Sequence, residues 1–174
     1  RPRDILQMLK YLQKNRQSTE GFVIKEDFEN TAFQREYSRY LLGEIKDHLL
    51  FYYSESDYQN FLKFFEFLNG KNRFDYAEYL KSFNNLRNHL NSTSVKTPKF
   101  MNTANEFLQF LFDLNVIAYI DIPEIGGKPY IHWCFKDRNY ANISPKVKTE
   151  TEYIVFVGLE KALDLGTRFK HKQT

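Results

Sequence analysis

Cysteine is almost absent from this chain of 174 residues, since the only one is Cys134. A single cysteine cannot form an internal disulfide, and no Cys/His cluster has the spacing of a zinc site. Long apolar runs are also missing: no stretch approaches the ~20 residues that span a bilayer, and the first residues lack the apolar core of a signal peptide. We therefore expect a soluble, cytoplasmic protein with no membrane partner.

Glycine and proline are scarce, with 7 and 5 residues, and the first residue is not methionine. The composition is globular, with 42% apolar and 27% charged residues. Aromatic side chains are plentiful instead, with 17 Phe, 12 Tyr and one Trp, and such rings fill cores or partner-facing surfaces. The missing methionine suggests that the chain is a piece of a longer protein.

Motifs of a self-contained enzyme are absent. Gly127-Lys128 does not belong to a phosphate loop, because Ile122 stands where the first glycine is required and Pro129 removes a backbone N–H. His132 and Cys134 lie two apart on a predicted strand, but without further Cys or a nearby His ordinary strand packing explains the pair better. We expect no catalysis by this chain, no catalytic residue, no metal and no cofactor.

Residues 1–70 are predicted to be helical. Apolar residues at helical spacing predict a first helix through Ile5, Met8, Leu9 and Leu12, a longer one over residues 25–51, and a third that begins at the capping residues 54–57. Asn69-Gly70-Lys71-Asn72 is a turn-like break, which we take as the boundary between residues 1–70 and residues 71–174. The first part is expected to be a lid-like helical bundle.

Residues 71–174 combine helices with strands. Periodicity predicts helices over residues 76–90 and from the capping box Thr103 to Glu106. Strands are predicted over residues 116–120, 130–135 and 153–157, followed by a short helix over 159–165 and a basic tail. Two helices and a hairpin are typical of a winged-helix domain. The predicted fold class is mainly α with a small β part.

The net charge of +3 lies in the second half of the chain. Residues 126–148 hold five basic side chains and one acidic one, Asp137. A basic wing is where nucleic-acid phosphates would bind, and a solvated basic face is the equally good alternative. The candidate nucleic-acid-binding residues are Lys128, Lys136, Arg138, Lys146 and Lys148. Tyr130, Trp133 and Tyr140 lie among them and offer rings on which bases stack.

Arg1-Pro2-Arg3-Asp4-Ile5-Leu6-Gln7 resembles the segment just after the nucleotide-binding domain in bacterial P-loop ATPases of the AAA/STAND kind. The stretches at 36–41, 132–135 and 153–163 are similar to the carboxy-terminal helical and winged-helix region of that family. The resemblance implies that the Walker motifs lie before Arg1 and that ATP and Mg bind to the full-length protein. It also implies that Arg3, with Arg1 as a second candidate, senses the nucleotide γ-phosphate.

The resemblance implies a non-catalytic module that couples the nucleotide state of a bacterial ATPase to DNA or to a protein partner. Its first partner would be the upstream ATPase domain of the same chain, and DNA and a second copy stay open. One alternative is a protein-interaction or oligomerisation module that binds no nucleic acid, and another is a stand-alone winged-helix transcription regulator. Exposed rings favour interaction, whereas a basic groove along the Phe107 helix and the wing favours DNA.

Overall fold

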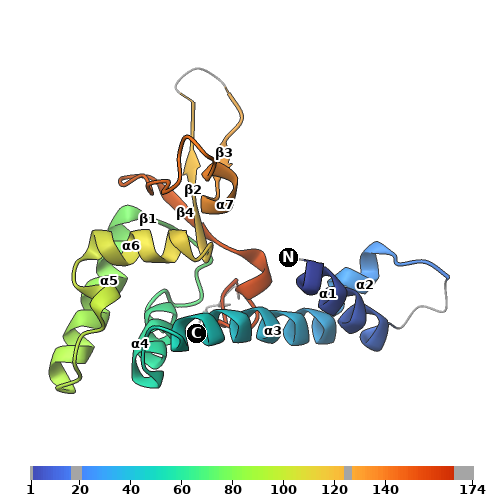
Figure 1. Ribbon diagram of the computed structural model, residues 1–174, viewed down its shortest axis with the longest axis horizontal. Helices are drawn as coiled ribbons and strands as arrows, with labels where there is room; N and C mark the ends of the chain where they lie inside the picture. Colours follow the sequence, from blue (N-terminus) through green and yellow to red (C-terminus); the bar gives the residue numbers. More distant parts are fainter. Residues whose placement is uncertain (1, 17–20, 124–126, 167–174) are drawn as a thin grey trace, which may run out of the picture.

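The computed structural model describes residues 2–16, 21–123 and 127–166. It consists of a helical arm that extends from a mixed body of helices and strands (Figure 1). The arm contains α1 (Pro2–Asn15), α2 (Lys25–Glu29) and α3 (Thr31–Leu50). The α1 helix packs against α3, where Tyr40 donates its hydroxyl to the Asp4 carboxylate at 2.8 Å and Lys14 pairs with Glu36 at 2.6 Å.

The single helix predicted over residues 25–51 is wrong, because Asn30 divides it into α2 and α3. Asn30 has an extended backbone, with φ −60° and ψ 121°, which ends α2. Its side-chain oxygen accepts hydrogen bonds from the backbone N–H groups of Ala32 and Phe33, so Asn30 also begins α3 as its N-cap. An asparagine side chain can accept hydrogen bonds from nearby backbone N–H groups, and these bonds compete with those of a continuous helix.

The body begins with helices whose starts are fixed by capping residues. They are α4 (Glu55–Glu66), α5 (Tyr76–Ser92) and α6 (Ala104–Asp113), with the short strand β1 (Arg73–Asp75) before α5 and the short 3-10 helix η1 (Lys99–Met101) before α6. Ser54, Asp75 and Thr103 each accept a hydrogen bond from the backbone N–H three residues later. The predicted starts at Ser54 and Thr103 are thereby confirmed.

A small antiparallel sheet completes the body. It contains β1, β2 (Ile117–Asp121), β3 (Tyr130–His132) and β4 (Glu152–Val155) in the order β1-β4-β2-β3. Phe74 of β1 pairs with Tyr153, and Ile117 of β2 pairs with Val155. The chain is therefore mainly helical with a small sheet, as the coarse fold class predicted. The short 3-10 helix η2 (Val157–Leu159) follows β4.

Two predicted elements differ from the structure. Residues 134 and 135 belong to the short helix α7 (Cys134–Asp137) rather than to a strand, because the Phe135 N–H donates to the Asn115 side chain instead of to β2. The helix predicted over 159–165 is η2 followed by turns, which end at Asp164 and Gly166 in the left-handed region. The predicted basic tail lies outside the described residues.

Aromatic rings dominate the core. Its fully buried rings include Tyr79, Tyr153, Phe61, Phe64, Phe107 and Phe112. One buried cluster runs from Leu49 to Leu165 and contains residues from both sides of the break at 69–72. Asn69 and Gly70 both have positive φ, so the predicted turn is present there, whereas the division into two domains stays a prediction.

Candidate functional site

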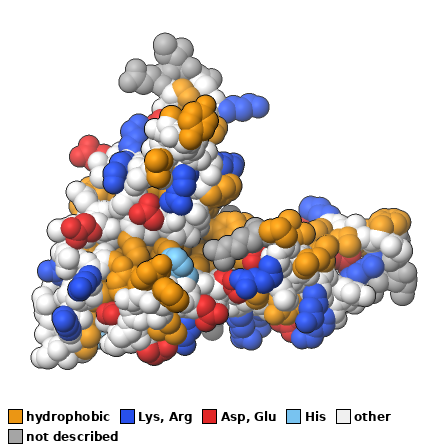
Figure 2. Space-filling view, viewed as in Figure 1, with side chains coloured by type: hydrophobic (Ala, Val, Ile, Leu, Met, Phe, Trp, Pro, Cys, Tyr) orange, Lys and Arg blue, Asp and Glu red, His pale blue; other side chains and the backbone are white. Residues whose placement is uncertain are grey.

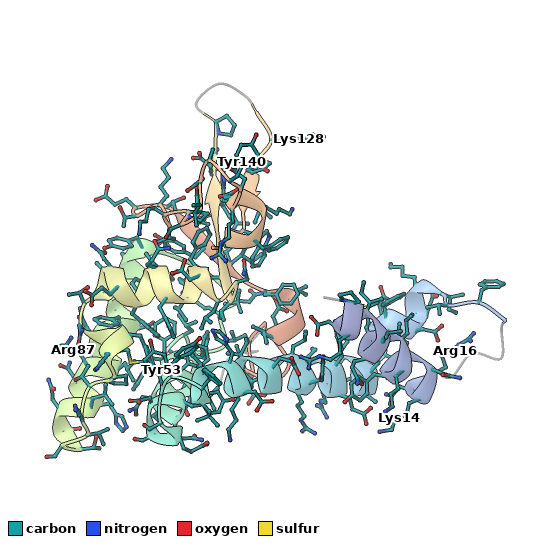
Figure 3. The ribbon with its side chains drawn as sticks, in the orientation of Figure 1. Lys14, Arg16, Tyr53, Arg87, Lys128 and Tyr140 are labelled. Carbon is teal, nitrogen blue, oxygen red and sulfur yellow. The ribbon has the colours of Figure 1, made fainter. Side chains whose placement is uncertain are left out.

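The five basic candidates all lie in the segment that joins β2 to β4, and all five side chains are exposed. Lys128 precedes β3, Lys136 and Arg138 lie in and just after α7, and Lys146 and Lys148 precede β4. Figure 3 labels Lys128 and Tyr140 at the same, outer end of the β-strand part. The charge pattern already placed these residues in one segment, and the structure adds that all five are exposed.

The charges of this segment are only partly neutralised. Lys148 donates to Asp121 at 2.8 Å, which lowers the pKa of that carboxyl. Asp137, the single acid among residues 127–148, lies 3.1 Å from Nδ1 of His132. In the described part of the chain, Lys128, Lys136, Arg138 and Lys146 form no ion pair with an acid. Four cations therefore remain available to an anionic ligand.

A tight turn at residues 139–142 presents the most exposed ring of this segment. The backbones of Asn139 and Asn142 exchange two hydrogen bonds of 3.1 Å, and the Asn139 side chain accepts from the N–H groups of Ala141 and Asn142. Between them Tyr140 is 98% exposed. An ordered turn thus holds an aromatic side chain away from the protein surface.

The α6 helix anchors the far end of the same loop. Gln109 donates to the carbonyl of Pro145 at 2.9 Å and accepts from the N–H of Val147 at 3.0 Å. The helix itself contains no Lys or Arg, and its exposed residues include Glu106 and Asp113. The basic groove along this helix that would favour duplex DNA is therefore not formed.

An apolar groove lies where the arm meets the body. It consists of two cavities of about 410 Å³ and about 360 Å³ that share Tyr37 and Phe156. The residues that line it from the arm include Asp4, Met8, Phe28, Phe33, Leu41 and Ile45, and those from the body include Leu114, Trp133, Phe135, Val157 and Leu159. Figure 2 shows apolar side chains in this corner. We call it the corner groove.

The groove is bordered by α1, whose outer face is apolar. Ile5, Leu6 and Leu9 are 57%, 67% and 46% exposed, while Leu12, nearer the end of the helix, is buried. The sequence pattern placed Ile5 and Leu9 in the same inward stripe as Leu12, but of these three side chains only Leu12 is buried. The missed signal is the width of the stripe, because five apolar residues in eight positions exceed what one contact with α3 can cover.

The structure pairs Arg3, the candidate nucleotide-sensing residue, with Glu44 of α3. The Arg3 side chain remains 59% exposed beside that contact. It stands in the first turn of α1, next to the apolar outer face. Arg1, the second candidate, lies outside the described residues.

His132 and Cys134 do not share a strand face, because Cys134 belongs to α7. His132 stacks on Tyr119 with ring centroids 4.5 Å apart. The thiol of Cys134 is buried, and burial raises its pKa, so it stays protonated and a poor nucleophile at neutral pH. Packing thus accounts for both side chains.

Comparison of the chain with models of protein families, with curated proteins and with solved structures finds no match in any of the three. Within residues 2–16, 21–123 and 127–166, no three or more Cys, His, Asp or Glu side chains are grouped so as to hold a metal ion. Over the same part of the chain, no helix has the length and apolar character to span a membrane.

Proposed function

We propose that this chain is a non-catalytic docking module of a bacterial P-loop ATPase, which couples nucleotide state to a bound partner. The observation that carries the proposal is the uncovered apolar face of α1, formed by Ile5, Leu6 and Leu9, beside the corner groove. A face of this kind is typical of a surface that packs against another domain. The amino-terminal resemblance supplies the ATPase domain as that partner.

The topology of the body supports a winged helix within this module. The order α4, β1, α5, α6, β2, β4 and the sheet order β1-β4-β2 match a helix-turn-helix core with a wing. In that comparison α6 is the recognition helix, and β3 with α7 is an insertion into the wing. The acidic exposed residues of α6 favour a protein partner over duplex DNA for this face.

In this proposal Arg3, at the edge of the docking face, has the coupling role. Its guanidinium is bound to Glu44 in the isolated chain, so sensing requires Arg3 to exchange a carboxylate for the γ-phosphate. The carboxylate is planar and the phosphate is tetrahedral, and a guanidinium can bind either anion through a pair of N–H groups. In this proposal the exchange ties the orientation of α1 to the bound nucleotide.

The test begins with the residues that precede Arg1 in the gene. The proposal requires a Walker motif there, and a coding sequence without one overturns the ATPase assignment. With the motif present, the upstream domain is purified separately and its binding to this chain is measured by calorimetry. Leu6→Asp and Leu9→Asp should each weaken binding about tenfold or more, because each buries a charge in an apolar contact.

Phe51→Asp provides the matched control. Phe51 is an exposed apolar residue at the opposite end of α3, so its replacement should leave the affinity unchanged. An equal loss of binding in Phe51→Asp, or wild-type affinity in both α1 variants, would contradict docking through α1.

A second candidate function is nucleic-acid binding by the β2–β4 segment, which the five exposed basic residues favour. A labelled 20-base-pair duplex titrated at several salt concentrations tests it. The four unpaired cations predict a log–log salt slope of about −3 to −4, at roughly −0.9 per phosphate. Lys136→Glu with Arg138→Glu should abolish binding, and unchanged binding would remove this candidate.

A further inference from the structure

The turn at residues 139–142 has the construction of a contact site. A ring that is 98% exposed gains nothing from burial in this chain, although four hydrogen bonds within the turn hold its backbone in place. The loop is held at its other end too, since Pro145 is buried and its carbonyl accepts from Gln109. Tyr140 is thus an exposed ring on an ordered support, which lowers the entropy lost when a ligand binds.

The sequence on both sides of the turn is cationic. Lys136 lies in α7, four positions before Tyr140, and Lys146 lies six positions after it. Lys128, which precedes β3, is labelled at the same end of the molecule as Tyr140 (Figure 3). None of the three is paired with an acid in the described residues. Charge complementarity therefore calls for a polyanion.

We propose that the 139–142 turn binds single-stranded nucleic acid, with a base stacked on the Tyr140 ring and the adjacent phosphates bound by Lys128, Lys136 and Lys146. This rests on the second candidate function and names its ligand. Surfaces that bind single strands combine exposed aromatic rings with basic side chains. The rings stack on the faces of the bases, and the basic side chains bind the phosphates between nucleotides.

A single strand fits this surface better than a duplex. Bases in a duplex are stacked on one another and offer no free face to Tyr140. Reading the major groove would require α6, which exposes Glu106 and Asp113 and contains no cation. The turn therefore contacts bases where the helix does not.

A lipid surface fits the turn less well. Tyr140 is flanked by Asn139, Ala141 and Asn142, and insertion of this turn would bury two amide side chains beside it in an apolar phase. Nucleic acid leaves those amides in contact with water or with the bases. The composition of the turn thus selects among anionic ligands.

The experiment is fluorescence anisotropy of the whole chain with a labelled deoxythymidine 20-mer, compared with a 20-base-pair duplex, at 50 and 200 mM salt. We expect the single strand to bind more tightly. Tyr140→Ala should weaken single-strand binding about 5-fold to 100-fold, and Tyr140→Phe should bind as the wild type does, because the ring is retained. Lys128→Ala with Lys136→Ala should reduce the salt slope by about 1.4, at roughly 0.7 per single-strand phosphate.

Tyr52→Ala is the matched control, since Tyr52 is an exposed tyrosine at the end of α3 and should not contribute. Equal losses in Tyr52→Ala and Tyr140→Ala would overturn the site. Duplex binding that needs the lysines but not Tyr140 would overturn the single-strand proposal while leaving the second candidate function intact. No binding of either probe, or binding only to phosphatidylserine vesicles that Tyr140→Ala abolishes, would overturn both. Docking through α1 is measured separately and is unaffected.

Discussion

Phe64 of α4 and Phe107 of α6 pack edge to face in the core, with ring centroids 5.0 Å apart and planes at 85°. Both side chains are fully buried, and Phe64 also contacts Tyr79 of α5. Edge-to-face pairs add stability beyond the burial of their area. Three helices of the body thus meet at one ring, and two of them lie on the far side of the break at 69–72.

Phe107→Ala should lower the free energy of unfolding by about 3–5 kcal/mol, because it removes a buried ring and leaves a cavity. Urea unfolding followed by circular dichroism measures it. Phe51→Ala is the control, since Phe51 is 81% exposed and its loss should change stability by less than about 0.5 kcal/mol. Similar effects in the two variants would show that Phe107 is not in the core.

Asn30→Ala should cost about 1 kcal/mol of stability, because the N-cap of α3 loses its side-chain acceptor. Asn30→Asp keeps an oxygen for the N–H groups of Ala32 and Phe33 but loses the amide that donates to the Asn15 carbonyl. The aspartate should therefore recover most of the loss. Thermal melts of both variants decide this, and a melt of Asn30→Ala at the wild-type temperature would contradict the cap.

The features that sequence reasoning located correctly depend on local chemistry. The starts of α4 and α6 follow from Ser54 and Thr103, whose hydroxyls bond to backbone groups within one turn. The strand β1 was missed because its three residues include one buried side chain, Phe74, and it exists through pairing with β4, where Arg73 contacts Glu152 from 79 positions away. Local patterns carry no information about such a pairing.

In the candidate site, too, some features follow from local sequence and others depend on contacts between distant segments. The basic residues of the β2–β4 segment could be found from charge alone. The tight turn was missed although Asn139 and Asn142 are residues that favour turns through side-chain bonds to the backbone. The corner groove was not predictable, because Tyr37 and Phe156 meet there from segments that are distant in sequence. The exposed face of α1 could not be predicted either, because it depends on how much of α1 is covered by α3.

The free energy of unfolding should fall at alkaline pH, because the hydroxyl of Tyr79 is buried in its protonated form. Burial raises the pKa of its hydroxyl, which donates to the Ala104 carbonyl at 2.6 Å, and burial raises the pKa of Tyr153 as well. Unfolded tyrosine ionises near pH ~10, so the unfolded chain releases these protons first. The stabilisation is complete below pH ~10 and is lost as the pH rises above it.

Ultraviolet absorbance of tyrosinate during a pH titration checks this, because Tyr79 and Tyr153 should ionise only as the chain unfolds. Tyr79→Phe should cost about 1 kcal/mol at neutral pH, since the Ala104 carbonyl loses its donor, and should flatten the loss of stability above pH ~10. Ionisation of all 12 tyrosines near pH ~10 in a chain that remains folded would contradict the expectation.

The pairing of Arg3 with Glu44 allows the nucleotide-sensing role to be separated from a structural one. The contact is more than half exposed on the Arg3 side, so in the isolated chain both Arg3→Ala and Glu44→Ala should change stability by less than about 1 kcal/mol. Thermal melts of the two variants measure this, and they also show whether each variant is folded.

In the full-length protein the two variants should diverge. Removing an arginine that stabilises transferred phosphate costs ~10³-fold or more in turnover, and Arg3→Lys should not restore it, because an ammonium lacks the planar pair of donors. Glu44→Ala should retain ATP hydrolysis, since it leaves the Arg3 guanidinium in place to bind the phosphate. Steady-state ATP hydrolysis by the three variants is the measurement. Wild-type turnover in both Arg3 variants, or an equal loss in Glu44→Ala, would make Arg3 a residue that only holds α1 against α3.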